Sequence, residues 1–373
     1  MFRGEFNSLI INIKQLITLI YLLMVKYDKM ILKRIIKSIF PKKFFVVKSQ
    51  IIFYLAYIYE YITYYKFNLN NFNKDYKKNK TQLKKINFVS SRGFLNYFVI
   101  NPFQEESLSI YNNNNTYYIP TDAIEIFIKK YLPNIQNKFK IITGNSDLAV
   151  DYKIDKILTL LNNKYLIKMY SQNLLIRHKK LMNLPIGIDL HSRFSINRRG
   201  PGKILPKPFE NIFIKTIKIK KIKKNKIYCN FHFRLNLSRK DCLKKIPKNL
   251  CVFQNKKITQ AQTWREIKKY KFVACPDGNG VDTHRFWETV LLGSIPIILK
   301  TNKLISLYKK MPVIIVKDWN IINHNFLKKK YIKLKNKKFN YNILFMKYWI
   351  NLIEQNKVKQ NKKMTYKSFI KFI

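Results

Sequence analysis

The sequence predicts an α/β protein whose second half contains a parallel sheet. Between residues 226 and 316, short apolar runs alternate with stretches that carry apolar side chains at helical spacing. Strands and helices that alternate in this way form right-handed βαβ crossovers. The apolar runs are continuous, which is typical of parallel strands covered on both faces.

The predicted elements follow this pattern in order. We expect strands at 226–233, 250–253, 272–275, 295–299 and 312–316, and helices at 239–245, 259–270, 283–293 and 302–309. In the first half we expect a strand at 140–143, a helical segment over 151–170 and a strand at 184–189. The glycine, proline and lysine residues of 200–226 indicate a domain boundary. The predicted domains are therefore 86–225 and 226–340, followed by a helical tail at 341–373.

Residues 1–85 differ from the rest of the chain and read as a helical segment with a linker. The apolar stretch 9–25 is interrupted by Asn12, Lys14 and Gln15, whereas a membrane-spanning helix needs about 20 predominantly apolar residues. It is a signal anchor, a helix lying on a membrane or a helix packed on the body. No small-residue cleavage site follows it, which argues against a cleaved signal peptide. Four cysteines are too few for a disulfide framework, and this, with the lack of a clean signal, favours a cytoplasmic location; membrane association through 9–25 is the alternative.

Composition excludes a disordered chain, because 47% of the residues are hydrophobic and 25% are charged. The net charge is +53, and 62 of the 73 basic residues are lysine. Lys, Asn, Ile, Tyr and Phe share A/T-rich codons, so we attribute the charge to codon bias and expect no specific nucleic-acid partner. The lysine runs at 215–226 and 328–338 are expected to be solvated. The electrostatic field of this positive charge still favours anionic substrates such as nucleotide diphosphates.

One segment, 272–299, carries the strongest chemical signal. It reads as a strand, a loop containing Gly278 and Gly280, a helix and a second strand. Such a loop lies at the carboxyl end of a parallel strand, where open α/β sheets bind ligands. We expect the glycines to allow close backbone approach and to adopt positive φ. The helix that starts near Thr283 offers free N–H groups to a phosphate. The alternative is an ordinary turn.

Two charged residues on that helix extend the site. Arg285 offers a guanidinium for bidentate contact with a diphosphate. Glu288 lies three residues on, on the same face, and can accept hydrogen bonds from the hydroxyls of a ribose or sugar. The alternative is a surface salt bridge. Elsewhere, Cys229 and His232 have the spacing of metal ligands, but the sequence offers no convincing second pair of ligands, so we do not expect a metal site there.

The segment resembles the exostosin-like glycosyltransferases, which carry a Pro-x-Gly-x-Gly loop, an Arg-x-x-Glu helix and a Gly-x-Ile-Pro turn. The matching positions are Pro276, Gly278 and Gly280, then Arg285 and Glu288, then Gly293, Ile295 and Pro296. A looser similarity covers 140–320, including 143–147, 172–173 and 184–191. The resemblance implies the GT-B architecture, an α/β fold of two Rossmann-like domains facing each other across a cleft, here with an extra N-terminal helical segment.

The resemblance also implies an activity, transfer of a sugar from a nucleotide-sugar donor, by family a UDP-sugar, to a glycan or glycoprotein hydroxyl. The second domain would bind the donor and the first the acceptor. No Asp-x-Asp motif occurs, so we expect no divalent metal and no cofactor. The expected catalytic residues are Asp147, Arg285 and Glu288, and the expected substrate-binding residues are Gly278, Asn279, Gly280, Asp282, Thr283, His284 and His191.

Two points stay open in this hypothesis. Asp147 and His191 are candidates only because each follows an expected strand of the first domain; Asp147 would act as general base in an inverting transfer. The alternative function is an inactive binding protein of the same fold, or a peripheral protein held on an anionic membrane or nucleic acid by its basic surface. We expect Trp264, Trp319 and Cys275 to be core residues.

Overall fold

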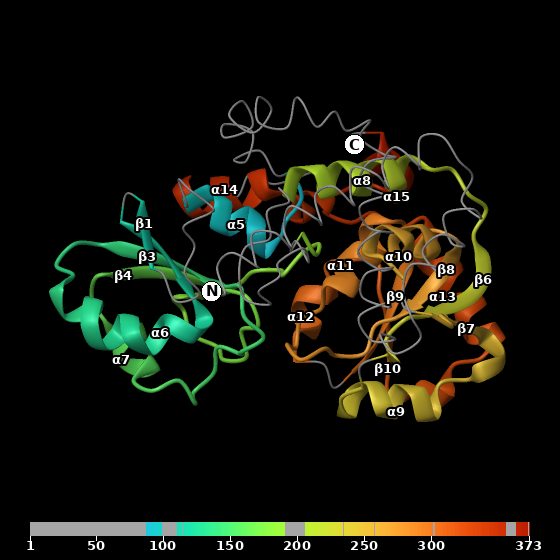
Figure 1. The fold of residues 1–373 in the computed structure, drawn as a ribbon, viewed down its shortest axis with the longest axis horizontal. Coiled ribbons are helices and arrows are strands. Elements are labelled where there is room, and N and C mark those ends of the chain that lie inside the picture. Colours follow the sequence, from blue (N-terminus) through green and yellow to red (C-terminus); the bar gives the residue numbers. More distant parts are fainter. Residues whose placement is uncertain are drawn as a thin grey trace, which may run out of the picture. The chain divides into compact units, whose positions relative to one another are not determined.

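The computed structural model describes residues 87–98, 110–113, 115–190, 206–233, 235–256, 258–300, 303–355, 363–371 and 373. All of them belong to one compact unit. They form two five-stranded sheets with flanking helices (Figure 1), an arrangement compatible with two Rossmann-like domains. No helix within these ranges is both long enough and apolar enough to cross a membrane. The segment 9–25 and His191 lie outside the described residues.

The first sheet has the order β1-β2-β3-β4-β5. β1 runs antiparallel to β2, and every other neighbouring pair is parallel. The strands are β1 (Tyr111–Asn113), β2 (Thr116–Pro120), β3 (Phe139–Gly144), β4 (Leu166–Ser171) and β5 (Leu181–Asn183). A run of helical turns joins β2 to β3, made of η4 (Thr121–Ala123), α6 (Ile124–Ile126), η5 (Phe127–Tyr131) and η6 (Leu132–Asn134), and α7 (Ile157–Asn162) joins β3 to β4.

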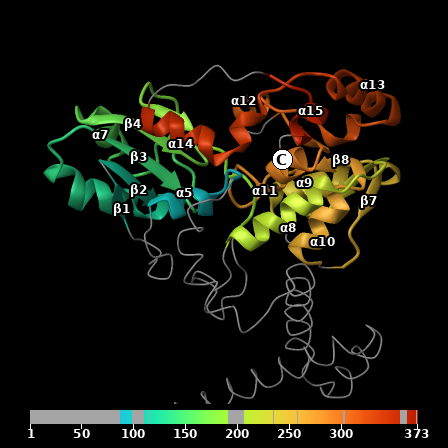
Figure 2. The ribbon, with the colours of Figure 1, turned by 90° about the horizontal axis from the view of Figure 1, so that it is seen from above.

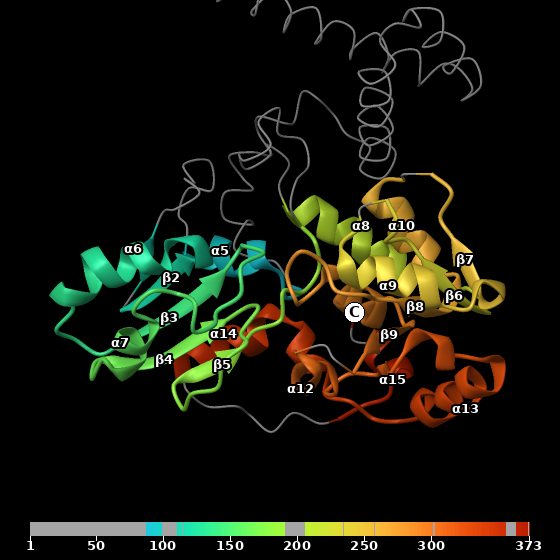
Figure 3. The ribbon, with the colours of Figure 1, turned by 90° about the horizontal axis from the view of Figure 1, so that it is seen from below.

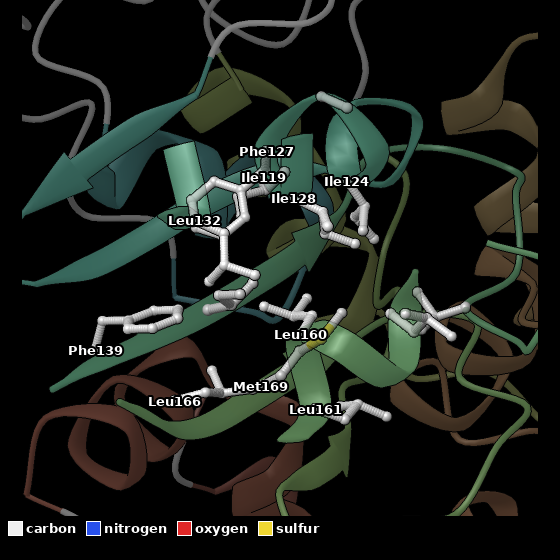
Figure 4. Close-up of a cluster of buried hydrophobic side chains, with 14 of the residues drawn as sticks. Ile119, Ile124, Phe127, Ile128, Leu132, Phe139, Leu160, Leu161, Leu166 and Met169 are labelled. Carbon is white, nitrogen blue, oxygen red and sulfur yellow. The ribbon is translucent and has the colours of Figure 1, made fainter. Parts of the chain in front are cut away.

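The core of this part lies between the sheet and those helical turns (Figure 4). Phe139 and Ile141 of β3 face it, because side chains two residues apart point to the same face of a strand. Lys140, between them, points to the other face and donates a hydrogen bond to the backbone carbonyl of Ile353. Both faces of the first sheet are therefore covered, as parallel strands require.

The second sheet is entirely parallel and has the order β10-β9-β8-β6-β7. Its strands are β6 (Lys224–Cys229), β7 (Cys251–Phe253), β8 (Tyr270–Ala274), β9 (Ile295–Leu299) and β10 (Ile314–Val316). Its helices are α9 (Leu237–Lys245), α10 (Gln260–Ile267), α11 (His284–Leu291), α12 (Ile305–Tyr308) and α13 (His324–Lys335), with short turns η7 (Lys248–Leu250) and η8 (Trp319–Ile321). The predicted alternation of strands and helices over 226–316 is confirmed, although the strand expected at 226–233 ends at Cys229. Trp264, Trp319 and Cys275 are buried as expected.

Two predictions for the first half are wrong. The helical segment expected over 151–170 ends at Asn162, and residues 166–171 form β4 in the middle of the sheet. The strand expected at 184–189 is a loop with a single bridge, between Gly187 and Ser90. Gly187 has φ of 70°, which no continuous strand accommodates. The loop's amides instead bond to side chains of the second half, as described below.

Helices outside the two sheets tie the described parts together: α5 (Ser91–Phe98), α8 (Pro206–Lys218), η9 (Tyr341–Leu344), α14 (Met346–Gln355) and α15 (Tyr366–Ile370). α5 lies beside α14 (Figure 1), and the Met346 amide donates to the carbonyl of Asn87 at 2.8 Å. Glu210 of α8 accepts the amides of Asn87 and Phe88 at 2.6 and 2.7 Å. α8 also packs on α10 (Figure 2), through an edge contact between Phe213 and Trp264.

One lysine of the run 215–226 is not solvated, contrary to expectation. The Nζ of Lys223 donates to the backbone carbonyls of Lys268 and Leu292 and to Ser294 Oγ, at 2.8–3.1 Å. Those carbonyls are at the C-caps of α10 and α11, where a cation is favoured. Burial, helped by the nearby charge of Lys268, lowers the pKa of Lys223 to about 7.

Candidate functional site

The loop between β8 and α11 lies where the order of the second sheet reverses. The chain passes from β6 to its neighbour β7 on one side and returns to β8 on the other side of β6. The carboxyl ends of β6 and β8 therefore form a topological switch point, the place where open α/β sheets bind ligands. Thr283 is the N-cap of α11, but its side chain does not cap the helix. The first-turn N–H groups thus receive no bond from the N-cap side chain.

The two glycines of the loop behave differently from the prediction. Neither Gly278 nor Gly280 has positive φ, so that expectation is wrong. Close approach is required at Gly280, because a Cβ there would lie 3.0 Å from Nδ2 of Asn173. A Cβ at Gly278 would meet only ordinary contacts, the nearest being Thr283 and the guanidinium of Arg239 at 3.4–3.5 Å.

The start of α9 holds the loop from one side. Asn236, the N-cap of α9, donates from Nδ2 to the carbonyls of Asp277 and Gly278 at 3.2 and 2.5 Å. The amide of Asp277 donates to Ser238 Oγ at 3.1 Å. Arg239, on the next position, brings a guanidinium to the glycine loop. The sequence predicts a helix at 239–245 but does not predict this role of Arg239; the one signal for it is Asn236, a residue type that favours the N-cap of a helix.

Asp282 organises the loop from inside the protein. It is 3% exposed, and its carboxylate accepts four hydrogen bonds of 2.7–2.8 Å, from the amides of Ile186 and Thr283 and the side chains of Trp287 and Tyr308. Its own amide donates to Asn173 Oδ1 at 2.8 Å. Burial raises the pKa of Asp282, and the donated hydrogen bonds oppose that rise. The hydrogen-bonding positions of the Asp282 carboxylate are therefore filled by donors of the protein itself.

Arg285 extends from the first turn of α11 to the switch point. Burial raises the pKa of both Tyr228, near the end of β6, and Cys275, just after β8, and the positive charge of Arg285 opposes both shifts. Nε and Nη1 of Arg285 are shielded from solvent and have no hydrogen-bond partner within the described residues. Glu288 Oε2 is 4.0 Å from Nε, beyond hydrogen-bonding distance. The guanidinium is thus held in place with two donor atoms unused.

Glu288 is buried beside Arg285 and touches the first half of the chain. Its Oε1 accepts from the amide of Asp189 and from Nε2 of Gln260, both at 3.4 Å. Gln260 Nε2 also donates to the carbonyl of Asp189 at 2.5 Å. The carboxylate therefore faces the guanidinium with one oxygen and the 184–189 loop with the other.

Segments that follow the strands of the first sheet meet the glycine loop. Asn279 Nδ2 donates to Oδ2 of Asp147, after β3, at 3.2 Å, and Asp147 is exposed. His284 Nδ1 lies 2.9 Å from the carbonyl of Gly187, after β5. Asn173, after β4, bonds to Asp282 as described. The carboxyl ends of both parallel sheets are therefore joined at one place, which brings Asp147, Asn279, Asp282, His284 and Glu288 together.

Other candidate groups do not join this site. His232 Nε2 lies 2.8 Å from the carbonyl of Gln254, a contact that fixes the ring without Cys229. Across the ranges that the structure describes, no group of three or more His, Cys, Asp or Glu side chains is arranged to hold a metal ion.

No described protein family matches the chain, and no curated protein is significantly similar to it. The exostosin-like resemblance stays a prediction.

Proposed function

We propose that the protein is a glycosyltransferase that moves a sugar from a nucleotide-sugar donor, by resemblance a UDP-sugar, to a hydroxyl of a glycan or glycoprotein. The observation that carries the proposal is Arg285, whose buried Nε and Nη1 lack partners at the switch point of the second sheet. A buried donor left unpaired costs about 1–3 kcal/mol. A phosphate satisfies two guanidinium donors at once, in a bidentate contact.

The surroundings of Arg285 suit a diphosphate. A Cβ at Gly278 would meet only ordinary contacts, the side chain of Thr283 leaves the start of α11 to an anion, and the guanidinium of Arg239 borders the same loop. During transfer the bond between the sugar's anomeric carbon and the diphosphate oxygen breaks, and negative charge develops on the leaving diphosphate. Arg285 and Arg239 would stabilise that charge, a role that preorganised donors perform without reorganisation.

The acceptor would approach from the first sheet, in the two-domain arrangement of the GT-B type. The bonds from Asn279 to Asp147 and from His284 to Gly187 support this, because they join the carboxyl ends of the two sheets. Asp147 is exposed there, and in an inverting transfer it would take the proton of the acceptor hydroxyl. Glu288 would bind hydroxyls of the donor, and Asp282 would position the loop.

Calorimetric titration with UDP, GDP, ADP and CMP in the presence of EDTA tests the proposal. The wild type should bind one nucleotide selectively, without a metal. Arg285→Ala should weaken that binding about tenfold or more, the loss expected for a charged hydrogen bond. Lys328→Ala, which removes the same charge from an exposed position of α13, should bind like the wild type. Mixing the selected nucleotide's sugar derivatives with candidate glycans should then release the nucleoside diphosphate.

The contrary result is weak binding that is similar for all four nucleotides, disappears with salt and is unchanged in Arg285→Ala. Such binding is typical of a basic surface that attracts polyanions. It would favour the peripheral-protein alternative and end the transferase proposal.

A further inference from the structure

A cluster of exposed apolar side chains lies beside the glycine loop. Phe233, Leu235 and Leu237 are 36%, 42% and 85% exposed. Phe233 and Leu235 lie between β6 and α9, and Leu237 is the first residue of α9, the helix that lies beside the second sheet (Figure 3). Single exposed apolar residues are ordinary, whereas three within five positions concentrate exposed apolar surface in one short segment.

The patch is edged by positive charge. On α9, Lys240 and Lys244 lie three and seven positions after Leu237, so they share its face of the helix, and both are exposed. Asp241, which follows Lys240 in the sequence, is paired with Lys245 at 2.8 Å. Exposed apolar side chains and exposed lysines are therefore presented together, which is the composition of surfaces that bind at a membrane interface.

Contacts beneath the patch hold it in position. The ring of Phe233 lies 4.4 Å from that of His232, which is anchored to the carbonyl of Gln254. Asn236, between the two leucines, points its side chain at the glycine loop and bonds to Asp277 and Gly278. Hydrogen bonds of His232 and Asn236 thus hold the backbone of this segment, while the neighbouring apolar side chains are exposed.

We propose that the surface made of Phe233, Leu235, Leu237, Lys240 and Lys244 docks on an anionic lipid bilayer. The three apolar side chains enter the interface between headgroups and acyl chains, and the lysines contact anionic headgroups. The inference goes beyond glycosyl transfer and does not require it. A nucleic acid would use the lysines but would leave the two leucines exposed to water, so the lipid surface accounts for more of the patch.

Hydrogen exchange of the full chain with vesicles tests the proposal locally. This matters because residues 9–25 are candidates for membrane contact in their own right. Vesicles of phosphatidylcholine with about a third phosphatidylserine should slow exchange of the amides of 233–240, and pure phosphatidylcholine vesicles should do so far less. The lysine-rich α13, with exposed Lys328 and Lys333, serves as the internal control and should be unchanged.

Variants separate the two components of the surface. Lys240→Gln with Lys244→Gln should raise the vesicle concentration needed for half-protection of 233–240 by about thirtyfold. Leu235→Ser with Leu237→Ser should raise it at constant charge, while Lys328→Gln with Lys333→Gln should leave it unchanged. Exchange at 233–240 that is unaffected by vesicles would overturn the proposal. So would equal protection of α13, protection that ignores the leucine pair, or protection by an oligonucleotide but not by lipid.

Discussion

Replacing Asp282 should destabilise the whole described unit, because its carboxylate is a shared acceptor for four donors from three segments of the chain. In Asp282→Ala, the amide of Ile186, the indole of Trp287 and the hydroxyl of Tyr308 lose their acceptor inside the protein. Each unpaired buried donor costs about 1–3 kcal/mol. The amide of Thr283 lies at a helix start and can turn to water. Allowing for partial relaxation, we expect a loss of about 3–5 kcal/mol in the free energy of unfolding.

Asp282→Asn should cost less, about 1–2 kcal/mol. It keeps one oxygen, enough for the donors that bond to Oδ1, but turns an NH₂ group toward the amide of Ile186. Urea unfolding followed by tryptophan fluorescence and circular dichroism measures both values, with the slope m checking that unfolding remains two-state. Asp147→Asn, at an exposed carboxylate, is the matched control and should change stability by about 0.5 kcal/mol or less. If Asp282→Ala were as stable as this control, the hydrogen bonds assigned to Asp282 would not hold the loop.

Three further stability predictions follow from particular contacts. Gly293→Ala should cost about 2 kcal/mol or more in thermal unfolding, because Gly293 has φ of 71° and a Cβ would collide with the ring of Tyr366; Gly278→Ala, with ordinary contacts, should be near neutral. Unfolding free energy should rise with pH from about 7 toward 10.5, by up to about 1.4 kcal/mol per pH unit, because the lowered pKa of Lys223 leaves the unfolded state with more bound protons. Lys223→Met should flatten that rise in urea titrations across the range, and an unchanged slope would refute the assignment. Glu210→Gln should cost about 1–2 kcal/mol in urea, because its carboxylate accepts two backbone amides before α5.

The second half could be predicted closely from the sequence because each of its strands contains a short apolar run that is followed by a helix or a turn. β9, for example, is found at Ile295–Leu299, as predicted. The first half offered weaker signals. β4 follows α7 after only three residues, and nothing in the composition of 151–170 marks the change from helix to strand. The loop at 184–189 has an apolar run like a strand, but its amides bond to Asp282 and Glu288 from the other half.

The sequence motif of the candidate site could be recognised, but the residues that its side chains contact could not be predicted. The spacing of Gly278, Gly280, Arg285 and Glu288 predicted a candidate ligand-binding loop, and the structure brings these residues to the switch point of the second sheet. The sequence did not reveal that Asp282 would be occupied by protein donors, since that depends on residues about a hundred positions away. Nor did it identify Arg239, whose proximity to the loop follows from the order of the strands. A local sequence pattern does not determine which distant segments of the chain come into contact.

The proposed function depends most on one contact, that of Arg285 with the phosphates of a nucleotide. It is tested most directly by comparing a nucleoside diphosphate with its parent nucleoside, using the nucleotide that binds best. The dissociation constant of the diphosphate should rise about tenfold to a hundredfold in Arg285→Ala, and that of the nucleoside should stay the same. If both ligands weakened equally, or if neither changed, Arg285 would not be a phosphate ligand and the proposed function would lose its support.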